Sequence, residues 1–160
     1  SAIQSLFLLA VLLPPLAFGG EVVVTDGDGL RLNGKRMRLW GIDAPELGQE
    51  CGRGGALYRC GEEAREVLGA LLLGGGVSCE TVDQDRYGRM VVRCMANGKD
   101  LAAEMVRLGW AVDYHRYSKG TYAAIEADAR HHRRGLWAGE FENPAGWRAR
   151  NGRKHIPHSK

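Results

Sequence analysis

Three short clusters of charged residues carry side chains that could act together on a phosphodiester. They are Asp26-Gly27-Asp28-Gly29, the segment Arg38 to Glu46 (RLWGIDAPE) and the segment Asp85 to Arg89 (DRYGR). Each cluster taken alone is more typical of a solvated turn or loop. Together, Asp28 and Asp43 could place two hard oxygen ligands around one Ca²⁺, whose shell backbone carbonyls and water would complete.

The remaining charged residues of these clusters suit the other needs of phosphate chemistry. Arg38 and Arg89 carry planar guanidinium forks that can donate two hydrogen bonds to one phosphate. Glu46 lies close to Asp43 in the chain and could take a proton from water. A cation, two arginines and a carboxylate neutralise the phosphate, stabilise its transition state and activate a nucleophile, so the clusters point to phosphodiester hydrolysis.

Short strands joined by tight turns are predicted to position the clusters. The β-branched run 21–25 ends at the first cluster, and residues 30–32 and 35–40 flank Asn33-Gly34, a strong hairpin signal. We expect a loop over 41–55. Two further strands are predicted at 77–82 and 90–95, joined by 83–89. Each charged cluster therefore lies at the end of a predicted strand.

Helical periodicity appears between and after these strands. The spacing of apolar residues predicts helices over 56–72, 101–108 and 122–134, the second ended by Gly109 and the third beginning behind a Thr121 cap and ended by Gly135. Five short strands with an inserted helix and a helical C-terminal third indicate an α+β fold with a mainly β core. We expect a partly open, five-stranded Greek-key barrel of the OB-fold type with about three helices packed on it.

Composition supports one globular domain, and the basic balance belongs to one end of the chain. The 160 residues are 44% hydrophobic and 26% charged, which excludes a disordered chain, and the formal net charge is +3. Five of the 22 Lys and Arg residues lie in 143–160, which leaves 17 against all 19 acidic residues in 21–142. We expect one globular domain at 21–142 and a flexible basic tail at 143–160 that attracts polyanions in a salt-sensitive way.

The N-terminus and the cysteines favour export. The apolar stretch 6–18 resembles the core of a signal peptide, with a retained membrane anchor as the alternative reading of 1–20. Four cysteines in a short chain predict disulfides, with four free thiols as the alternative. Cys79 and Cys94 lie symmetrically about the turn at Tyr87-Gly88 and should pair, which leaves Cys51 to pair with Cys60. We therefore expect a periplasmic or extracellular protein.

The order of several motifs resembles the staphylococcal nuclease (thermonuclease) family over roughly 22–138. The motifs are D-G-D at 26–28, R-L-x-G-I-D-A-P-E at 38–46, D-R-Y-G-R at 85–89, L-x-x-x-M-V-x-x-G-W-A at 101–111, Y-x-x-x-E-x-x-A-R at 122–130 and G-L-W at 135–137. The resemblance implies an OB-fold and a Ca²⁺-dependent endonuclease that cuts DNA and RNA with little sequence preference. Such enzymes break the bond between phosphorus and the 5′ oxygen and leave 3′-phosphate ends.

The resemblance also implies roles for single residues of this chain. Arg38, Glu46 and Arg89 match the catalytic residues, with Glu46 as general base and the arginines on the phosphate. Asp28 and Asp43, with the backbone carbonyl of Ala44, match Ca²⁺ ligands. The residues matching the nucleotide site are Asp85, Arg86, Tyr87, Tyr114 and Tyr117.

Two positions depart from the family pattern, and one alternative function stays open. Gly29 stands where a Thr is usual, which puts the affinity for Ca²⁺ in question, and Ala44 replaces a frequent Thr. The substrates implied are DNA and RNA, single-stranded or unpaired regions favoured, cut by a monomer with no protein partner. The alternatives are a catalytically silent OB-fold module that binds nucleic acid or protein, and a purely structural secreted domain.

Overall fold

The computed structural model describes residues 20–152 of the chain. The expected signal peptide or anchor at 1–20 falls almost entirely outside these residues, as do the last eight residues of the expected tail. Within 20–152, no helix combines the length and apolar character needed to cross a bilayer.

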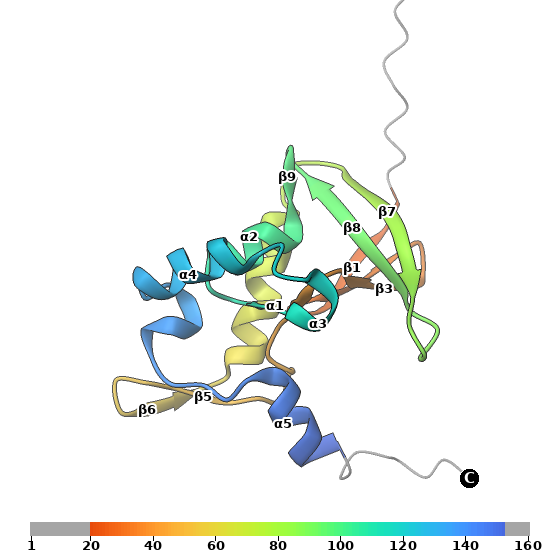
Figure 1. Cartoon of the computed structure of the whole chain (residues 1–160). Helices are drawn as coiled ribbons and strands as arrows, with labels where there is room; N and C mark the ends of the chain where they lie inside the picture. Colours follow the sequence, from red (N-terminus) through yellow and green to blue (C-terminus); the bar gives the residue numbers. More distant parts are fainter. Residues whose placement is uncertain (1–19, 153–160) are drawn as a thin grey trace, which may run out of the picture.

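A six-stranded sheet forms one side of the molecule (Figure 1). Its order is β1-β2-β3-β8-β7, and the short β9 pairs with the free end of β8. All neighbours are antiparallel except β3 and β8, which run parallel. The strands are β1 (Val22–Asp26), β2 (Gly29–Leu32), β3 (Lys35–Leu39), β7 (Val77–Gln84), β8 (Met90–Ala96) and β9 (Lys99–Asp100).

The five predicted strands are confirmed, and so is the predicted hairpin turn between β2 and β3. Asn33 and Gly34 both have positive φ, 52° and 77°, as a two-residue turn that follows the twist of its strands requires. Within the described residues no pairing joins β1 to β7, so the sheet is not closed into a barrel by hydrogen bonds. The α+β class predicted from the sequence is confirmed.

Helices α1, α2 and α4 gather on the other side of the molecule (Figure 1), where α1 packs against β1 and α2 against β8. The described residues form five α-helices and one 3-10 helix, against about three helices predicted. They are α1 (Cys60–Leu71), α2 (Leu101–Arg107), α3 (His115–Ser118), α4 (Ala123–His131), α5 (Pro144–Asn151) and the 3-10 helix η1 (Gly135–Ala138).

The helix predicted over 56–72 is wrong at its N-terminal end. Residues Ala56–Tyr58 form β6, which pairs with β5 (Cys51–Arg53) around Gly54 and Gly55, two glycines with positive φ. This glycine pair makes a tight hairpin turn, so the helix starts only at Cys60. The loop predicted over 41–55 is therefore wrong at β5.

That loop prediction is also wrong at β4 (Ile42–Asp43), which pairs with β10 (Val112–Asp113) from a distant part of the chain. The helix predicted over 122–134 is shorter than expected, because α4 ends at His131 and Arg133 has a positive φ of 52°. Thr121 does not cap it; its hydroxyl donates to the Ser118 carbonyl instead.

The expectation of a flexible tail is wrong for residues 144–151, which form α5. The Asn143 side chain accepts a hydrogen bond from the Ala145 N–H at 3.0 Å, and Pro144 occupies the first turn. Both features are favoured at helix starts. Figure 1 shows α5 beside the β5–β6 hairpin, at the end of the molecule away from β9.

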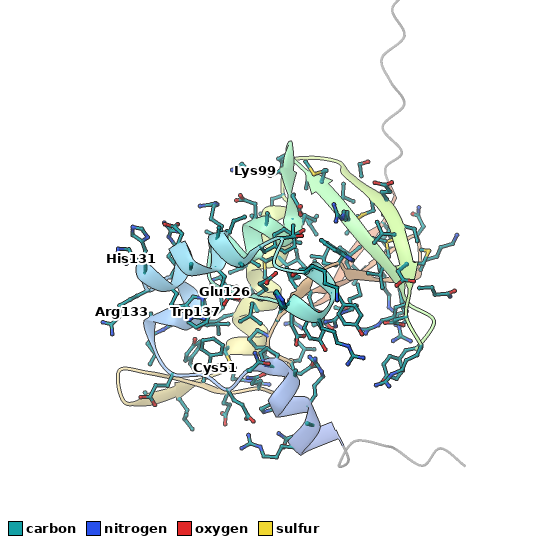
Figure 2. All side chains as sticks on the ribbon, in the orientation of Figure 1. Cys51, Lys99, Glu126, His131, Arg133 and Trp137 are labelled. Carbon is teal, nitrogen blue, oxygen red and sulfur yellow. A yellow bond between two sulfur atoms is a disulfide. The ribbon has the colours of Figure 1, made fainter. Side chains whose placement is uncertain are left out.

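The apolar residues form a main core between the sheet and helices α1 and α2, and a smaller second cluster. The second cluster contains Cys51, Cys60 and Leu136, and Figure 2 shows Cys51 near Trp137 at this end of the molecule. Both predicted disulfides are present: Cys51–Cys60 joins β5 to α1, and Cys79 bonds Cys94 directly opposite it in the β7–β8 ladder.

Candidate active site

Two buried aspartates lie next to each other at the end of the sheet. Asp28, in the turn between β1 and β2, is 5% exposed, and Asp43, in β4, is 1% exposed. The turn can lie this close because of Gly27, where an added Cβ would be 2.7 Å from the Ala44 Cβ. The turn is further shaped by Asp26, whose Oδ1 accepts the Asp28 N–H at 3.2 Å.

A contact with α4 holds the strand that carries Asp43. The N–H of Asp113, in β10, donates to Glu126 Oε2 at 2.6 Å, and β10 in turn pairs with β4. The position of Asp43 thus depends on residues about seventy and eighty positions later in the chain.

One arginine joins the two buried carboxylates. Arg38 Nη1 donates to Asp28 Oδ1 at 3.4 Å, and Arg38 Nη2 donates to Asp43 Oδ1 at 3.1 Å. Burial raises the pKa of Asp28 to about 7, although the Arg38 charge opposes the shift. Burial also acts to lower the pKa of Arg38, but the two carboxylates outweigh it and the pKa rises.

The loop after β4 brings Ala44 and Glu46 to the same place. The Ala44 N–H donates to Asp28 Oδ2 at 2.8 Å, which connects the second charged cluster to the first. The Glu46 N–H donates to Gln49 Oε1 at 3.3 Å, and Gln49 is fully buried. The structure therefore brings together Asp28, Arg38, Asp43, Ala44 and Glu46, which we call the acidic cluster.

Arg148, from α5, enters the acidic cluster and was not predicted from the sequence. Its Nη1 donates to Asp43 Oδ1 at 2.7 Å and to Glu46 Oε1 at 2.8 Å, and its Nη2 donates to Asp43 Oδ2 at 2.9 Å. Burial acts to lower the pKa of Arg148, but bonding to Asp43 and Glu46 outweighs it and the pKa rises. The local sequence signal for α5 is Asn143-Pro144, which is typical of a helix start. The prediction of a flexible tail did not take this signal into account.

Gln49 is the second residue that sequence reasoning missed. Its Nε2 donates to the Glu142 carbonyl at 2.7 Å, while its Oε1 accepts the Glu46 N–H. One buried amide therefore links the loop of the acidic cluster to the segment that precedes α5. Nothing in the local sequence around Gln49 marks this role.

The third charged cluster forms a turn of its own between β7 and β8. Arg89 Nε donates to Asp85 Oδ2 at 2.7 Å, and Asp85 Oδ1 accepts the N–H groups of Tyr87 and Arg89 at 2.9 and 3.0 Å. Burial acts to raise the pKa of Asp85, but these hydrogen bonds outweigh it and the pKa is lowered.

The sheet register relates this turn to the acidic cluster. Val91 lies opposite Arg38 in the parallel β3–β8 pair, and Arg89 precedes Val91 by two residues. Arg89 lies immediately before β8 begins at Met90, so the turn that carries it adjoins the strand paired with Arg38. Within residues 20–152, no hydrogen bond or ion pair joins Arg89 to the acidic cluster.

The predicted aromatic residues lie in two places, Tyr87 in the turn between β7 and β8 and Tyr114 and Tyr117 at α3. Tyr87 is exposed, with the Arg86 guanidinium 4.9 Å from its ring centroid. Tyr114 and Tyr117 pack edge to face with centroids 5.0 Å apart, and the Tyr114 N–H donates to the Gly41 carbonyl at 2.8 Å. The tyrosine pair is thus tied to the chain between Arg38 and Asp43.

The donors of the acidic cluster fit a hard divalent cation. Two buried carboxylates and backbone carbonyls are the oxygen ligands that Ca²⁺ takes, whereas zinc sites use nitrogen and sulfur. The part of the chain that the structure describes contains no group of three or more His, Cys, Asp and Glu side chains placed to hold a metal ion. A cation here would therefore depend on backbone oxygens and water beyond Asp28 and Asp43.

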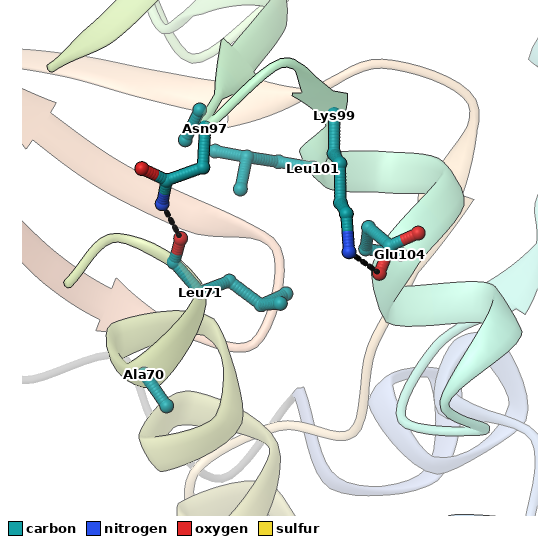
Figure 3. A pocket seen from close by; sticks show the side chains of 7 residues that line it. Ala70, Leu71, Asn97, Lys99, Leu101 and Glu104 are labelled. Carbon is teal, nitrogen blue, oxygen red and sulfur yellow. Dashed lines mark hydrogen bonds and ion pairs between the residues drawn. The ribbon is translucent and has the colours of Figure 1, made fainter. Parts of the chain in front are cut away.

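A recess elsewhere in the molecule contains none of these residues. It lies between the C-terminal end of α1 and the start of α2, where Asn97 Nδ2 donates to the Leu71 carbonyl at 3.3 Å and Lys99 approaches Glu104 at 3.9 Å (Figure 3). Its polar groups are already paired with one another, so the chemistry concentrates in the acidic cluster.

Comparison with known proteins finds one family over most of the described body. The family described as staphylococcal nuclease homologue matches residues 36–139, which include Arg38, Asp43, Glu46 and Arg89. Asp28 and Arg148 lie outside the matched segment.

Three relatives illustrate the similarity. The chain is 39% identical over 127 residues to the succinoglycan biosynthesis protein ExoI of Rhizobium meliloti, covering 78% of this chain and 66% of that protein. It is 37% identical to the probable endonuclease LCL3 of Schizophyllum commune (71% of this chain, 44% of that protein). It is 32% identical to an uncharacterized endonuclease of Escherichia coli O157:H7 (75% and 76%). The match spans less than two thirds of the length of the first two of these relatives, and it spans 33% of a further relative, a probable staphylococcal-like nuclease of Oryza sativa.

Proposed function

The chain belongs to the family of staphylococcal nuclease homologues, and from this we propose that it is a Ca²⁺-dependent endonuclease that hydrolyses DNA and RNA to 3′-phosphate ends. The observation that carries the proposal is the single Arg38 guanidinium that spans the buried carboxylates of Asp28 and Asp43. The names of several relatives, endonuclease or nuclease, support the reaction class.

The carboxylates of Asp28 and Asp43, with the Ala44 carbonyl, would hold the Ca²⁺ ion. When bound, the ion would neutralise phosphate charge and make a nearby water more acidic. All three residues are buried, and the Ala44 N–H, next to Asp43 in the chain, donates to Asp28 Oδ2.

The side chains around this position divide the work of hydrolysis. Glu46 accepts a proton from the attacking water, whose oxygen bonds to phosphorus as the bond from phosphorus to the 5′ oxygen breaks. The electron pair of that bond leaves with the 5′ oxygen, which takes up a proton and becomes a hydroxyl. Arg38 and Arg89 donate hydrogen bonds to the nonbridging oxygens, where negative charge grows.

The flanking residues would hold the nucleotide chain. Tyr87 is exposed beside Arg86, and a base can stack on such a ring and its cation regardless of sequence. Asp85 fixes the direction of Arg89 through their ion pair. Tyr114 and Tyr117, at α3, offer a second aromatic surface.

We further propose that the sheet is an OB-type barrel left open between β1 and β7, and that the protein works as an exported monomer. The parallel β3–β8 pair and the β1-β2-β3 meander support the barrel type. The two disulfides support an oxidising compartment, because such bonds persist outside the reducing cytosol.

Denatured DNA incubated with the protein in Ca²⁺, and then in excess chelator, tests the proposal. We expect cleavage only with Ca²⁺, products with 3′-phosphate ends, and a rate about 10²–10⁴ lower for Glu46→Gln, as loss of a general base predicts. Glu62→Gln is the matched control, because its carboxylate pairs with Arg59 at the surface, away from the acidic cluster. Full activity of Glu46→Gln would overturn the mechanism.

The contact of Arg148 with both Asp43 and Glu46 favours a second candidate, a catalytically silent module that binds nucleic acid or protein. In that case the arginine would permanently replace the metal ion as the partner of these carboxylates. Binding of a labelled oligonucleotide without Ca²⁺-stimulated cleavage would establish this candidate.

A further inference from the structure

We propose that α5 supplies a built-in competitor for the metal ion: Arg148 and the divalent cation exclude each other at Asp43, so that metal binding requires release of Arg148. The inference rests on the proposed metal site at Asp28 and Asp43. It concerns a helix that follows the residues matched by the family, 36–139.

The hydrogen bonds of Asp43 are the first support. Its Oδ1 accepts from Arg38 Nη2 at 3.1 Å and from Arg148 Nη1 at 2.7 Å, which uses both lone pairs of that oxygen. Its Oδ2 accepts from Arg148 Nη2 at 2.9 Å. A cation at Oδ1 therefore needs a lone pair that an arginine now occupies.

The local charges are the second support. Arg148 places one positive charge within hydrogen-bond distance of the carboxylate that a divalent ion would share, and Asp43 is almost fully buried. Repulsion between cations is strong where water is excluded. Of the two arginines on Asp43, Arg148 is the one that can leave, because it is a third exposed whereas Arg38 is about half as exposed.

The packing of α5 is the third support. Pro144 is its only buried residue, so the helix contributes little apolar surface to the core. Trp147 lies over Gly48, where an added Cβ would be 3.8 Å from the ring. The bond from Gln49 to the Glu142 carbonyl precedes the helix and can persist when Arg148 moves away.

Calorimetric titration with Ca²⁺ alone, without nucleic acid, measures the competition. We expect Arg148→Gln to bind Ca²⁺ about tenfold more tightly than the unmodified protein, a size typical of coupling between two binding events. Arg148→Lys keeps the charge but loses the two-pronged contact, so its affinity should lie between the two. Arg150→Gln is the matched control, since Arg150 lies on the same helix and pairs only with Glu142 among residues 20–152.

Hydrogen exchange of the full chain gives a second readout that needs no variant. Because linkage is reciprocal, saturating Ca²⁺ should speed amide exchange in residues 145–151 of α5, whereas amides of the β7–β8 ladder should exchange no faster than before. Slower exchange in α5 on addition of Ca²⁺ would overturn the competition, as would an Arg148→Gln affinity equal to or weaker than that of the unmodified protein.

The Asp43→Asn variant separates this inference from the proposed function. One outcome would overturn the competition alone: the unmodified protein binds Ca²⁺, Asp43→Asn does not bind it, and Arg148→Gln binds it no more tightly than the unmodified protein. The metal site would then stand. If neither the unmodified protein nor Arg148→Gln binds Ca²⁺, the metal site itself is wrong and the competition is overturned with it.

Discussion

Two arginines from distant elements compensate the buried charge of one aspartate. Arg38 reaches Asp43 from β3 and Arg148 reaches it from α5. An isolated carboxylate buried to this degree would cost several kcal/mol, and removing one partner of such a pair exposes the rest of that cost. The residues of the proposed metal site therefore also help to keep the end of the sheet folded.

The Asp85–Arg89 pair gives a prediction about pH. Asp85→Asn keeps an acceptor at Oδ1 for the N–H groups of Tyr87 and Arg89 but loses the charged bond to Arg89 Nε. We expect a loss of about 1 kcal/mol in the free energy of unfolding at pH 7, the size of a partly buried charged hydrogen bond.

The sign of the pH dependence follows from the lowered pKa of Asp85. A carboxyl whose pKa is lower in the folded state than its ordinary value of 3.8 stabilises the protein at pH values above 3.8. This contribution is lost as the pH falls through the folded-state pKa. Urea unfolding measures the difference in the free energy of unfolding between the unmodified protein and Asp85→Asn. This difference should be present at pH 7 and absent near pH 2. Asp83→Asn, near the end of β7 and two residues before Asp85, is the control, and an equal loss there would contradict the argument.

Most of the acidic cluster could be predicted from the sequence because its members belong to short motifs at turns. Asp28, Arg38, Asp43 and Glu46 are all within 19 positions of one another, and the hairpin signals around them fix their spacing. Arg148 could not be predicted in the same way. Its contact with Asp43 spans 105 positions, and no local pattern tells which surface an amphipathic helix will cover.

The helix α2 depends on the side chain of one residue, Asp100. Asp100 Oδ1 accepts the N–H groups of Ala102 and Ala103 at 2.9 and 3.2 Å, and its Oδ2 accepts the Tyr122 hydroxyl at 3.1 Å. Burial, and then the Asp100 charge, raise the pKa of Tyr122, so the hydroxyl remains a donor. Asp100 therefore caps the start of α2 and connects this helix to α4. Four residues of α2 are buried.

Replacing Asp100 by Ala should therefore lower the free energy of unfolding by about 2 kcal/mol, the upper end for loss of a helix cap. Asn143→Ala is the matched control: it removes the cap of α5, a helix with a single buried residue, and should change the free energy by less than about 0.5 kcal/mol. Chemical denaturation measures both, and a similar loss in the two variants would show that α5 is part of the core.

The elements that the sequence predicted are those with their own local signal. The β-branched strands and the Asn33-Gly34 turn needed no information from elsewhere in the chain. The two-residue strands β4 and β10 are too short for a period to show, and they exist because Glu126 of α4 fixes β10. The β5–β6 hairpin was not predicted from the sequence, because its residues continue the apolar spacing of α1.

At the scale of the whole molecule, the charge distribution differs from a simple division into body and tail. The five cations of residues 143–160 give the chain its net charge of +3, but Arg148 returns to the acidic end of the sheet. Only part of the basic segment is thus available for loose attraction to a polyanion.

Ca²⁺ should stabilise the whole fold, because an ion bound to the folded chain shifts the unfolding equilibrium. At a free concentration 100 times its Kd, we expect the free energy of unfolding to rise by about 2.7 kcal/mol, and chelator should reverse the change. Cleavage could require Ca²⁺ while the melting temperature does not change when Ca²⁺ is added. That result would mean that the ion binds only together with the substrate.

The position of α5 outside the family-matched residues has a consequence for engineering. Its hydrogen bonds to the acidic cluster come through the Arg148 guanidinium, and the bond from Gln49 to the Glu142 carbonyl holds the segment before the helix. Exchanging the segment after residue 142 for helices with other side chains at position 148 would yield a graded series of proteins. Each would switch on at a different calcium concentration while keeping the same sheet and the same substrate surface.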